Sequence, residues 1–420
     1  MDTNPAAIFF AMRILGRILC LILFSPVFLT AQSSNDWQES TPEQQGIDSS
    51  ELVKLLEFVK NQNESIDSLL IARHGQIVLD VYYHPFAKDQ PHILNSVTKS
   101  FVSALIGIAI EQQFIINDGT RLRDWFPEAD KPGMRDIELR HLLTMTSGID
   151  WPQYGSHNVS DEMGHSADWI HFILNRRMAA TAGTVANYSN GDAHLLSAIL
   201  RRATGQDPLQ FATTNLFEPL AIPTPLWATD PQGLRIGSAA MFMRPRDMAK
   251  FGNLYLHNGN WHGRQVVPTG WIAKSLERHT SITISAGHAD YGYFWWLYPK
   301  LGMVEAWGGA GQRIGLFHDL DLVTVMTSNI GDDAPVTSFS TEIYSRILKA
   351  VKSAALPENP AQVDQIRKLI AEAAVTSHQP KRLSIWHRMI YQPTSWIGAA
   401  GAILTTVIFC LWRRRYRQIA

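Results

Sequence analysis

The sequence predicts an α+β fold in which an antiparallel sheet is completed by both ends of one domain, with an all-helical insertion between them. The first observation is a hairpin signal at 68–84, "SLLIARHGQIVLDVYYH", where two apolar runs flank a polar turn. The second is a series of short apolar runs between turn formers from 291 to 329. The third is that apolar residues in the middle of the chain recur at helical spacing. Strands at both ends with helices between them lead to this fold class.

The individual elements follow in chain order. A helix is expected at 49–62, "SSELVKLLEFVKNQ", because serine capping residues precede apolar residues at helical spacing. The hairpin at 68–84 comes next, and an apolar helix at 95–113 follows it. Further helices are expected at 136–149, 192–205, 244–259 and 340–355. The closing strands are expected at 291–299, 303–309, 313–319 and 322–329.

Composition excludes several classes of function. The chain has 420 residues, of which 45% are hydrophobic and 18% are charged, with a net charge of −1. These values are typical of a globular protein with a large core, and they give no electrostatic footprint for nucleic acid. No zinc-type Cys/His spacing, phosphate loop or dinucleotide fingerprint occurs, so we expect neither a metal nor a cofactor. The only cysteines are Cys20 and Cys410, so the domain between them has no disulfide.

The N-terminal segment is expected to be directed to a membrane, the alternative being a buried N-terminal helix. Arg13 and Arg17 precede the apolar stretch 18–29, and Ala31 stands where a signal peptidase would cut. A basic region, an apolar region and a small residue follow one another in this order in secretory signals. Residues 1–31 are therefore expected to be a signal peptide or, if uncleaved, a signal anchor.

The C-terminal segment is expected to cross a membrane. Residues 396–412 carry no charge, have a tryptophan at each edge and precede the basic tail 413–420, which fits a span with a cytoplasmic end. The preceding residues 356–395 are expected to form a stalk, followed by an interfacial helix at 381–391 that lies on membrane lipid. The domain at 40–355 would then sit at the cell membrane, on its periplasmic or extracellular side.

A serine and a lysine stand three residues apart at the start of the expected helix 95–113. Residues three apart share one helix face, so Ser96 and Lys99 can meet. The helix is apolar on nearly all sides, and burial would lower the pKa of Lys99 until it could act as a base. The alternative is a helix cap at Asn95 or Ser96 with Lys99 on the surface. Taken alone, the pattern favours the cap.

A second pattern, "NYSNGD", occupies 187–192. A tyrosine hydroxyl such as that of Tyr188 can pass a proton to a leaving group when a cation lies nearby. The amide of Asn190 can hold the lysine or the substrate by hydrogen bonds. The alternative is an ordinary turn before a helix, and alone it is favoured.

A third pattern, "AWGGAGQRI", occupies 306–314. Its glycines beside an expected strand would let another backbone approach closely, and one N–H could complete an oxyanion hole with that of Ser96. The alternative is a hairpin turn. The candidate residues here are Trp307, Gly308, Gly309 and Ala310.

In their order and spacing, the three patterns resemble the serine β-lactamase and penicillin-binding-protein-like hydrolase superfamily. The resemblance covers about residues 40–350 and is greatest for the class C branch, with its esterases and 6-aminohexanoate-oligomer hydrolases. It rests also on "HLLTMTSGI", "YSNGDAHLLSAILRRATGQ", "LFEPLAI", "RPRDMAKFG" and "YGYFWW". It implies a β-lactamase/transpeptidase-like fold. It also implies that Ser96 is the acylated nucleophile, Lys99 the base, Tyr188 the proton shuttle and Asn190 a positioning residue.

The third pattern departs from the superfamily. Members that handle penicillins carry a Lys-Thr-Gly or related motif, whereas this chain has Trp307-Gly308-Gly309. A β-lactam carboxylate would lack its usual cationic partner there. Trp-Gly-Gly is similar to the variant of family esterases, and Arg313 is the one nearby residue that could restore a charge. The second oxyanion N–H belongs to Gly309 or Ala310.

The expected function is that of an exported, membrane-anchored serine hydrolase with an acyl-enzyme on Ser96. Its substrate would be a small-molecule ester or amide, with peptidoglycan-derived amides included. The alternatives are a cell-wall D-Ala carboxypeptidase or endopeptidase, a β-lactamase, or a non-catalytic module that binds wall fragments. Aromatic residues of the regions 149–187 and 275–300 could line an apolar cleft, although such residues more often belong to the core: Trp151, Tyr154, Trp169 and Trp295.

Overall fold

The computed structural model describes residues 37–62, 66–153, 158–284, 287–329 and 338–376. The expected signal segment at 1–31, the interfacial helix at 381–391, the span at 396–412 and the tail at 413–420 all lie outside these ranges. Within these ranges, the structure contains no helix that is both long and apolar enough to cross a membrane.

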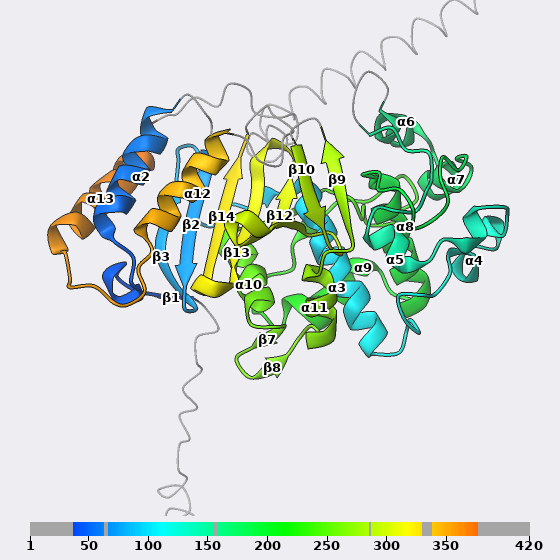
Figure 1. The fold of residues 1–420 in the computed structure, drawn as a ribbon, viewed down its shortest axis with the longest axis horizontal. Coiled ribbons are helices and arrows are strands. Elements are labelled where there is room, and N and C mark those ends of the chain that lie inside the picture. The colour runs from blue at the N-terminus through cyan, green and yellow to red at the C-terminus, as the bar shows by residue number, and fades with distance from the viewer. Residues whose placement is uncertain (1–36, 63–65, 154–157, 285–286, 330–337, 377–420) are drawn as a thin grey trace, which may run out of the picture. The chain divides into compact units, whose positions relative to one another are not determined.

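A sheet of nine strands forms the centre of the described domain (Figure 1). The strand order is β1-β3-β2-β14-β13-β12-β11-β10-β9. The early strand β2 and the late strand β14 lie side by side, and the hydroxyls of Ser68 and Thr327 are 2.6 Å apart across them. Both ends of the domain therefore complete the sheet, as expected. The strands are β1 Gln38–Glu39, β2 Ile66–Arg73, β3 Gln76–Tyr82, β9 Thr280–Ile284, β10 Gly287–Tyr291, β11 Trp296–Tyr298, β12 Met303–Gly308, β13 Gln312–Phe317 and β14 Leu322–Ser328.

The sheet is mixed and not purely antiparallel, because β1 runs parallel to β3. The lead-in to the domain thus adds an edge strand that its polar sequence did not predict. Trp37 anchors it, since this buried side chain donates from Nε1 to the carbonyl of Arg246 at 2.9 Å. The Arg246 guanidinium in turn forms ion pairs with Glu39 of β1 and Asp80 of β3.

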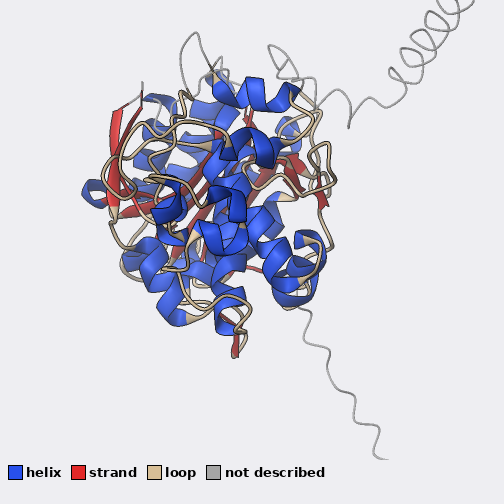
Figure 2. Ribbon diagram, turned by 90° about the vertical axis from the view of Figure 1, so that its right-hand side faces the viewer, coloured by secondary structure: helices blue, strands red, loops and turns tan. Residues whose placement is uncertain are grey.

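Helices cover both faces of the sheet. Alternate residues of β2 separate the two layers: Leu69 and Ile71 pack with the layer of α2, α12 and α13, and Leu70 and Ala72 with the layer of α10. A further group of helices lies beyond the β9 edge, in front of the sheet in Figure 2. The longer helices are α2 Ser49–Asn61, α3 Thr98–Glu111, α8 Asn190–Thr204, α10 Pro245–Leu256, α11 Thr269–Leu276, α12 Ser338–Ala350 and α13 Pro360–Ala373. The shorter ones are α4 Leu122–Trp125, α5 Leu139–Leu143, α6 Val159–His165, α7 Trp169–Leu174 and α9 Pro208–Ala212.

Two small sheets join loops of the helical region. One has the order β4-β6-β5, and the other pairs β7 with β8. Their strands are β4 His92–Ile93, β5 Leu226–Trp227, β6 Met241–Met243, β7 Asn260–Trp261 and β8 Arg264–Gln265. The first of them holds the segment just before Ser96, because Ile93 pairs with Phe242 and the N–H of Leu94 donates to the carbonyl of Met241 at 2.8 Å.

Several expected helices have different ends in the structure. The segment 95–113 begins with the 3-10 turn η2, Asn95–Val97, before α3 starts at Thr98. The segment 136–149 forms only the short helix α5, because Met145 adopts a left-handed backbone with φ of 60°. The helix α8 ends at Gly205, whose φ of 68° provides a left-handed cap.

The helix expected to form a stalk belongs to the packed domain. The buried side chains of Ile366, Leu369 and Ala373 on α13 join the hydrophobic cluster that contains Leu56 and Val59 of α2. Apolar positions three and four apart create this stripe, and α2 covers it. The domain therefore extends past residue 355, while the continuation of the stalk beyond 376 lies outside the described ranges.

We expect Ile366→Ala to lower the free energy of unfolding by about 2–5 kcal/mol, since the truncation leaves a cavity against α2. Urea denaturation measures this change. The exposed Lys368 on the same helix supplies the control, and Lys368→Ala should stay within about 0.5 kcal/mol of the wild type. Equal stability of the two variants would show that α13 does not pack as described.

Candidate active site

Ser96 lies in the turn η2 at the N-terminus of the buried helix α3. The turn is held by Asn95, which has a φ of 46° and donates from Nδ2 to the carbonyl of Gly309 at 2.7 Å. The first N–H groups of a helix have no partners within the helix, and they carry partial positive charge. The hydroxyl of Ser96 thus stands where a developing negative charge is stabilised.

The ammonium nitrogen of Lys99 contacts three oxygen atoms. It lies 2.8 Å from Ser96 Oγ, 2.8 Å from Asn190 Oδ1 and 2.8 Å from the carbonyl oxygen of Ser238. The side chain is only 1% exposed, and burial lowers the pKa of Lys99 well below its ordinary value. The structure thus brings Ser96 and Lys99 of the first pattern together with Asn190 of the second.

The geometry specifies how a neutral Lys99 would use its hydrogen bonds. A neutral amine has two N–H groups and one lone pair. The oxygens of Asn190 and Ser238 can only accept, whereas the hydroxyl of Ser96 can also donate. The two N–H groups therefore go to the two carbonyl oxygens, and the lone pair faces the Ser96 hydroxyl. This is the arrangement of a general base with its nucleophile.

Tyr188 forms an aromatic wall beside Lys99. The lysine nitrogen lies 4.9 Å from the centroid of the Tyr188 ring, and the ring is 5% exposed. Trp296 stacks on the Tyr188 ring, and the two ring centroids are 5.8 Å apart. Trp307 in turn meets Trp296 edge to face at 5.7 Å. The second and third patterns therefore meet through Trp296, a residue to which the sequence assigned no role.

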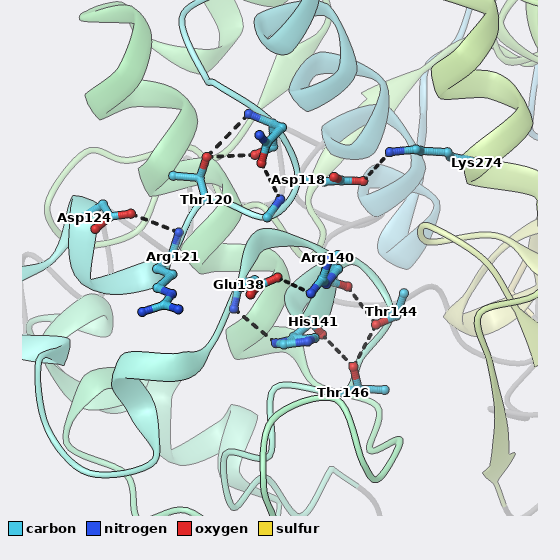
Figure 3. Close-up of polar contacts among 12 residues, drawn as sticks. Asp118, Thr120, Arg121, Asp124, Glu138, Arg140, His141, Thr144, Thr146 and Lys274 are labelled. Atoms are coloured by element: carbon cyan, nitrogen blue, oxygen red, sulfur yellow. Dashed lines mark hydrogen bonds and ion pairs between the residues drawn. The ribbon is translucent and has the colours of Figure 1, made fainter.

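The loop that carries Tyr188 is braced by the segment after α5. Asn187 donates its N–H to the carbonyl of Met145 at 2.8 Å, and Ser189 donates its N–H to the Met145 sulfur at 3.3 Å. The left-handed backbone of Met145 lets one residue hold both sides of Tyr188. Figure 3 shows the base of this brace, where Thr146 is hydrogen-bonded to Thr144 and to the carbonyl of His141.

Asp192 lies fully buried in the first turn of α8, beside this loop. Its Oδ1 accepts from the hydroxyls of Ser147 at 2.9 Å and Ser189 at 3.0 Å. Burial raises the pKa of Asp192 to about 7, although both hydroxyls oppose the shift. This carboxyl joins the Met145 segment to the Tyr188 loop.

The third pattern lies directly against the nucleophile. Gly308 ends β12, and a Cβ there would lie 2.3 Å from the carbonyl oxygen of Leu94 and 3.0 Å from the nitrogen of Ser96. Only glycine allows this approach. Gly309 and Ala310 follow in the turn η7, Gly309–Gly311, where Ala310 has a φ of 62°. Which of these two residues gives the oxyanion N–H stays a prediction.

Arg313 does not extend into the site. Its side chain is 1% exposed and forms an ion pair with Glu305 at 2.8 Å. Tyr344 donates a hydrogen bond to the same carboxylate. The guanidinium is thus committed to an interaction within the sheet layer, where it does not replace the cation missing from the third pattern.

The aromatic residues considered for an apolar cleft have different positions. Trp151 and Trp295 are fully buried and belong to the hydrophobic core. Trp169 is partly buried and packs against the core, whereas Tyr154 lies outside the described ranges. The core interpretation therefore holds for Trp151 and Trp295.

Sequence reasoning missed several contributors to the site. The carbonyl of Ser238 and the left-handed backbone of Asn95 and Met145 leave no trace in a residue pattern. Asp192 could have been considered, since it stands inside "NYSNGD", two residues after Asn190. Among the described residues, no group of three or more metal-binding side chains could hold a metal ion.

The profile of the Beta-lactamase family matches residues 57–340 of the sequence. The chain belongs to this family. A curated relative, the 6-aminohexanoate-dimer hydrolase of Paenarthrobacter ureafaciens, is 25% identical over 310 residues, which are 69% of this chain and 78% of the relative. A beta-lactamase of Escherichia coli K12 is 32% identical over 146 residues, which are 33% of this chain and 37% of the relative.

Solved structures show the same fold. A family VIII carboxylesterase has a TM-score of 0.61 and 15% identity over 74% of this chain and 99% of its own. A penicillin-binding protein homologue from Caulobacter crescentus has a TM-score of 0.59 and 14% identity over 72% of this chain and 96% of its own. This member of the Beta-lactamase family is a serine hydrolase with the β-lactamase/transpeptidase-like α+β fold.

The pH dependence of this hydrolase should follow the protonation of Lys99. A protonated lysine has no lone pair, so acylation should slow as the pH falls through the pKa of Lys99. Because burial lowers that pKa, we expect acylation to stay fast at pH values well below 10.5, the ordinary pKa of a lysine. In Lys99→Arg the guanidinium stays charged, and the rate should fall by at least about 100-fold.

The measurement is the initial release of p-nitrophenol from an ester at a series of pH values. A Lys99→Arg variant that is as fast as the wild type would exclude Lys99 as the base. Unchanged circular dichroism of the variant is the control for folding.

Proposed function

We propose that this protein is an exported, membrane-anchored serine hydrolase that cleaves an ester or amide through an acyl-enzyme on Ser96. The observation that carries the proposal is the 2.8 Å contact between the buried Lys99 nitrogen and Ser96 Oγ. A serine hydroxyl is a weak nucleophile, and such a base activates it.

The reaction begins when the Ser96 hydroxyl gives its proton to Lys99 and Oγ attacks the substrate carbonyl carbon. The N–H of Ser96 and that of Gly309 or Ala310 stabilise the resulting oxyanion. As the tetrahedral intermediate collapses, the alcohol or amine leaves and takes the proton through Tyr188. Water then attacks the acyl-enzyme, releases the acid and restores the Ser96 hydroxyl.

The substrate is proposed to be a small-molecule ester or amide without a carboxylate beside the scissile bond. Trp307 stands where penicillin-handling relatives have a cationic motif, and Arg313 is paired with Glu305. The names of the 6-aminohexanoate-dimer hydrolase and the carboxylesterase support a linear amide or an ester. A peptidoglycan-derived amide is included in this class.

A fluorophosphonate probe should label the wild-type protein at Ser96 and should fail to label Ser96→Ala. The probe traps the activated hydroxyl, so labelling reports the nucleophile directly. The exposed Ser353 gives a control. Ser353→Ala removes a hydroxyl that is far from Ser96 in the sequence, and the probe should label this variant fully. Equal labelling of Ser96→Ala and the wild type would exclude this nucleophile.

Fluorescent penicillin in the same assay separates the alternative functions. No reaction supports an esterase or amidase, a stable adduct supports a cell-wall peptidase, and rapid turnover supports a β-lactamase. A non-catalytic module that binds wall fragments would label with neither reagent and cleave neither p-nitrophenyl esters nor D-amino-acid amides.

The membrane proposal rests on the sequence of the two ends. An N-terminal signal and an uncharged C-terminal segment at 396–412 before four arginines would place the domain outside the cell. We expect the full chain in the membrane pellet and a chain of residues 32–395, without either terminal segment, in the supernatant. A full chain that alkaline carbonate releases from the pellet would contradict the anchor.

A further inference from the structure

A chain of hydrogen bonds runs from Lys99 into the helical region behind the site. Asn190 accepts from Lys99 through Oδ1 and donates through Nδ2 to Ser160 Oγ at 3.0 Å. Ser160 donates to Gln153 Oε1 at 2.7 Å. Ser160 and Gln153 lie in the region 149–187, where the sequence showed no pattern.

The direction of this chain is determined at its far end. Gln153 Oε1 lies 2.8 Å from the indole nitrogen of Trp151 and 3.4 Å from the backbone nitrogen of Asn190. Both groups can only donate, so the atom between them must be the amide oxygen. That oxygen can only accept, so Ser160 donates to it.

The same logic continues to the base. Because Ser160 uses its proton on Gln153, its oxygen accepts from Asn190, and the amide of Asn190 must present Nδ2 to it. The opposite end of that amide, Oδ1, therefore faces Lys99. Each group in this series of hydrogen bonds therefore allows the next group only one orientation.

Helix α6 holds Ser160 in place. Asn158 caps the helix by accepting the N–H of Ser160 at 2.9 Å. Val159 and Met163 are buried and anchor α6 against the rest of the helical region. The hydroxyl of Ser160 is thus presented from a fixed element and not from a free loop.

The orientation of Asn190 determines whether Lys99 can act as a base. With Oδ1 toward Lys99, a neutral amine donates to it and keeps its lone pair for the Ser96 hydroxyl. With the amide turned round, Nδ2 would donate to that lone pair and compete with Ser96. A rotated amide would thus block proton transfer without removing any catalytic side chain.

We propose that Ser160 is a positioning residue that acts through Asn190 to keep the lone pair of Lys99 directed at Ser96. This inference rests on the proposed function of Ser96 and Lys99. Ser160 itself touches neither of them. Its effect should therefore appear in the rate constant of acylation and leave the dissociation constant of the substrate nearly unchanged.

A double-mutant cycle tests the proposal with the full-length protein and p-nitrophenyl esters. Ser160→Ala should slow the acylation burst by about tenfold, the size of effect that a lost hydrogen bond produces. Ser160→Thr keeps the hydroxyl and should restore the rate to within about twofold. In an Asn190→Ala background, Ser160→Ala should cause no further loss, because the two residues act as one unit.

The matched control is Ser166→Ala at the C-terminal cap of the same helix. The hydroxyl of Ser166 donates to the carbonyl of Met163 at 2.9 Å and has no hydrogen bond to Asn190 in the described structure. Its removal should leave the burst at the wild-type rate. If Ser160→Ala does not fold, Ser160→Cys keeps the shape with a much weaker hydrogen bond and should show the same loss.

The proposal is overturned if Ser160→Ala acylates at the wild-type rate, if the two losses multiply, or if Ser166→Ala is equally slow. These results differ from a failure of the proposed function. In that case Ser96→Ala would keep its labelling by the fluorophosphonate probe, whatever the Ser160 variants do.

Discussion

The burial of the Lys99 side chain is the constraint on which the rest of the site depends. An isolated ammonium is costly to bury, and within the described residues Lys99 forms no ion pair. Its partners are a hydroxyl and two carbonyl oxygens, all uncharged, so the protein favours the neutral amine. The apolar helix α3 and the ring of Tyr188 keep water from this amine. The ability of Lys99 to act as a base is therefore a consequence of its exclusion from solvent.

Arg313, another buried basic residue, is stabilised in the opposite way. Arg313 is as deeply buried as Lys99 but has the carboxylate of Glu305 at 2.8 Å. Pairing keeps that guanidinium charged and commits it to a fixed place in the sheet layer. Among the described residues, Lys99 is thus buried without a carboxylate partner, whereas Arg313 is buried with one. Only the first is available for proton transfer.

Prediction from the sequence was most successful for features that depend on the local spacing of residues. The three-residue spacing of Ser96 and Lys99, the hairpin and the late strands follow from helical and strand repeats. It was weaker where packing between residues far apart in the sequence determines the structure. A polar lead-in gives no sign of a parallel strand, and an amphipathic helix such as α13 does not reveal which surface covers it. Left-handed residues such as Met145 were also missed, because nothing local in the residue type requires that backbone.

The position of β14 beside β2 has a consequence for the order of synthesis. Ser68 and Thr327 are neighbours in space but 259 positions apart in the chain. While a ribosome makes the protein, the β2 edge that will pair with β14 stays open until that much later segment emerges, and pairings this distant form slowly. Ser96 is made early, yet the turn after β12 that lies against it comes much later. A nascent chain that already contains Ser96, Lys99 and Tyr188 therefore still has an incomplete active site. It depends on protection from misfolding until β12, β13 and β14 have been made and have paired.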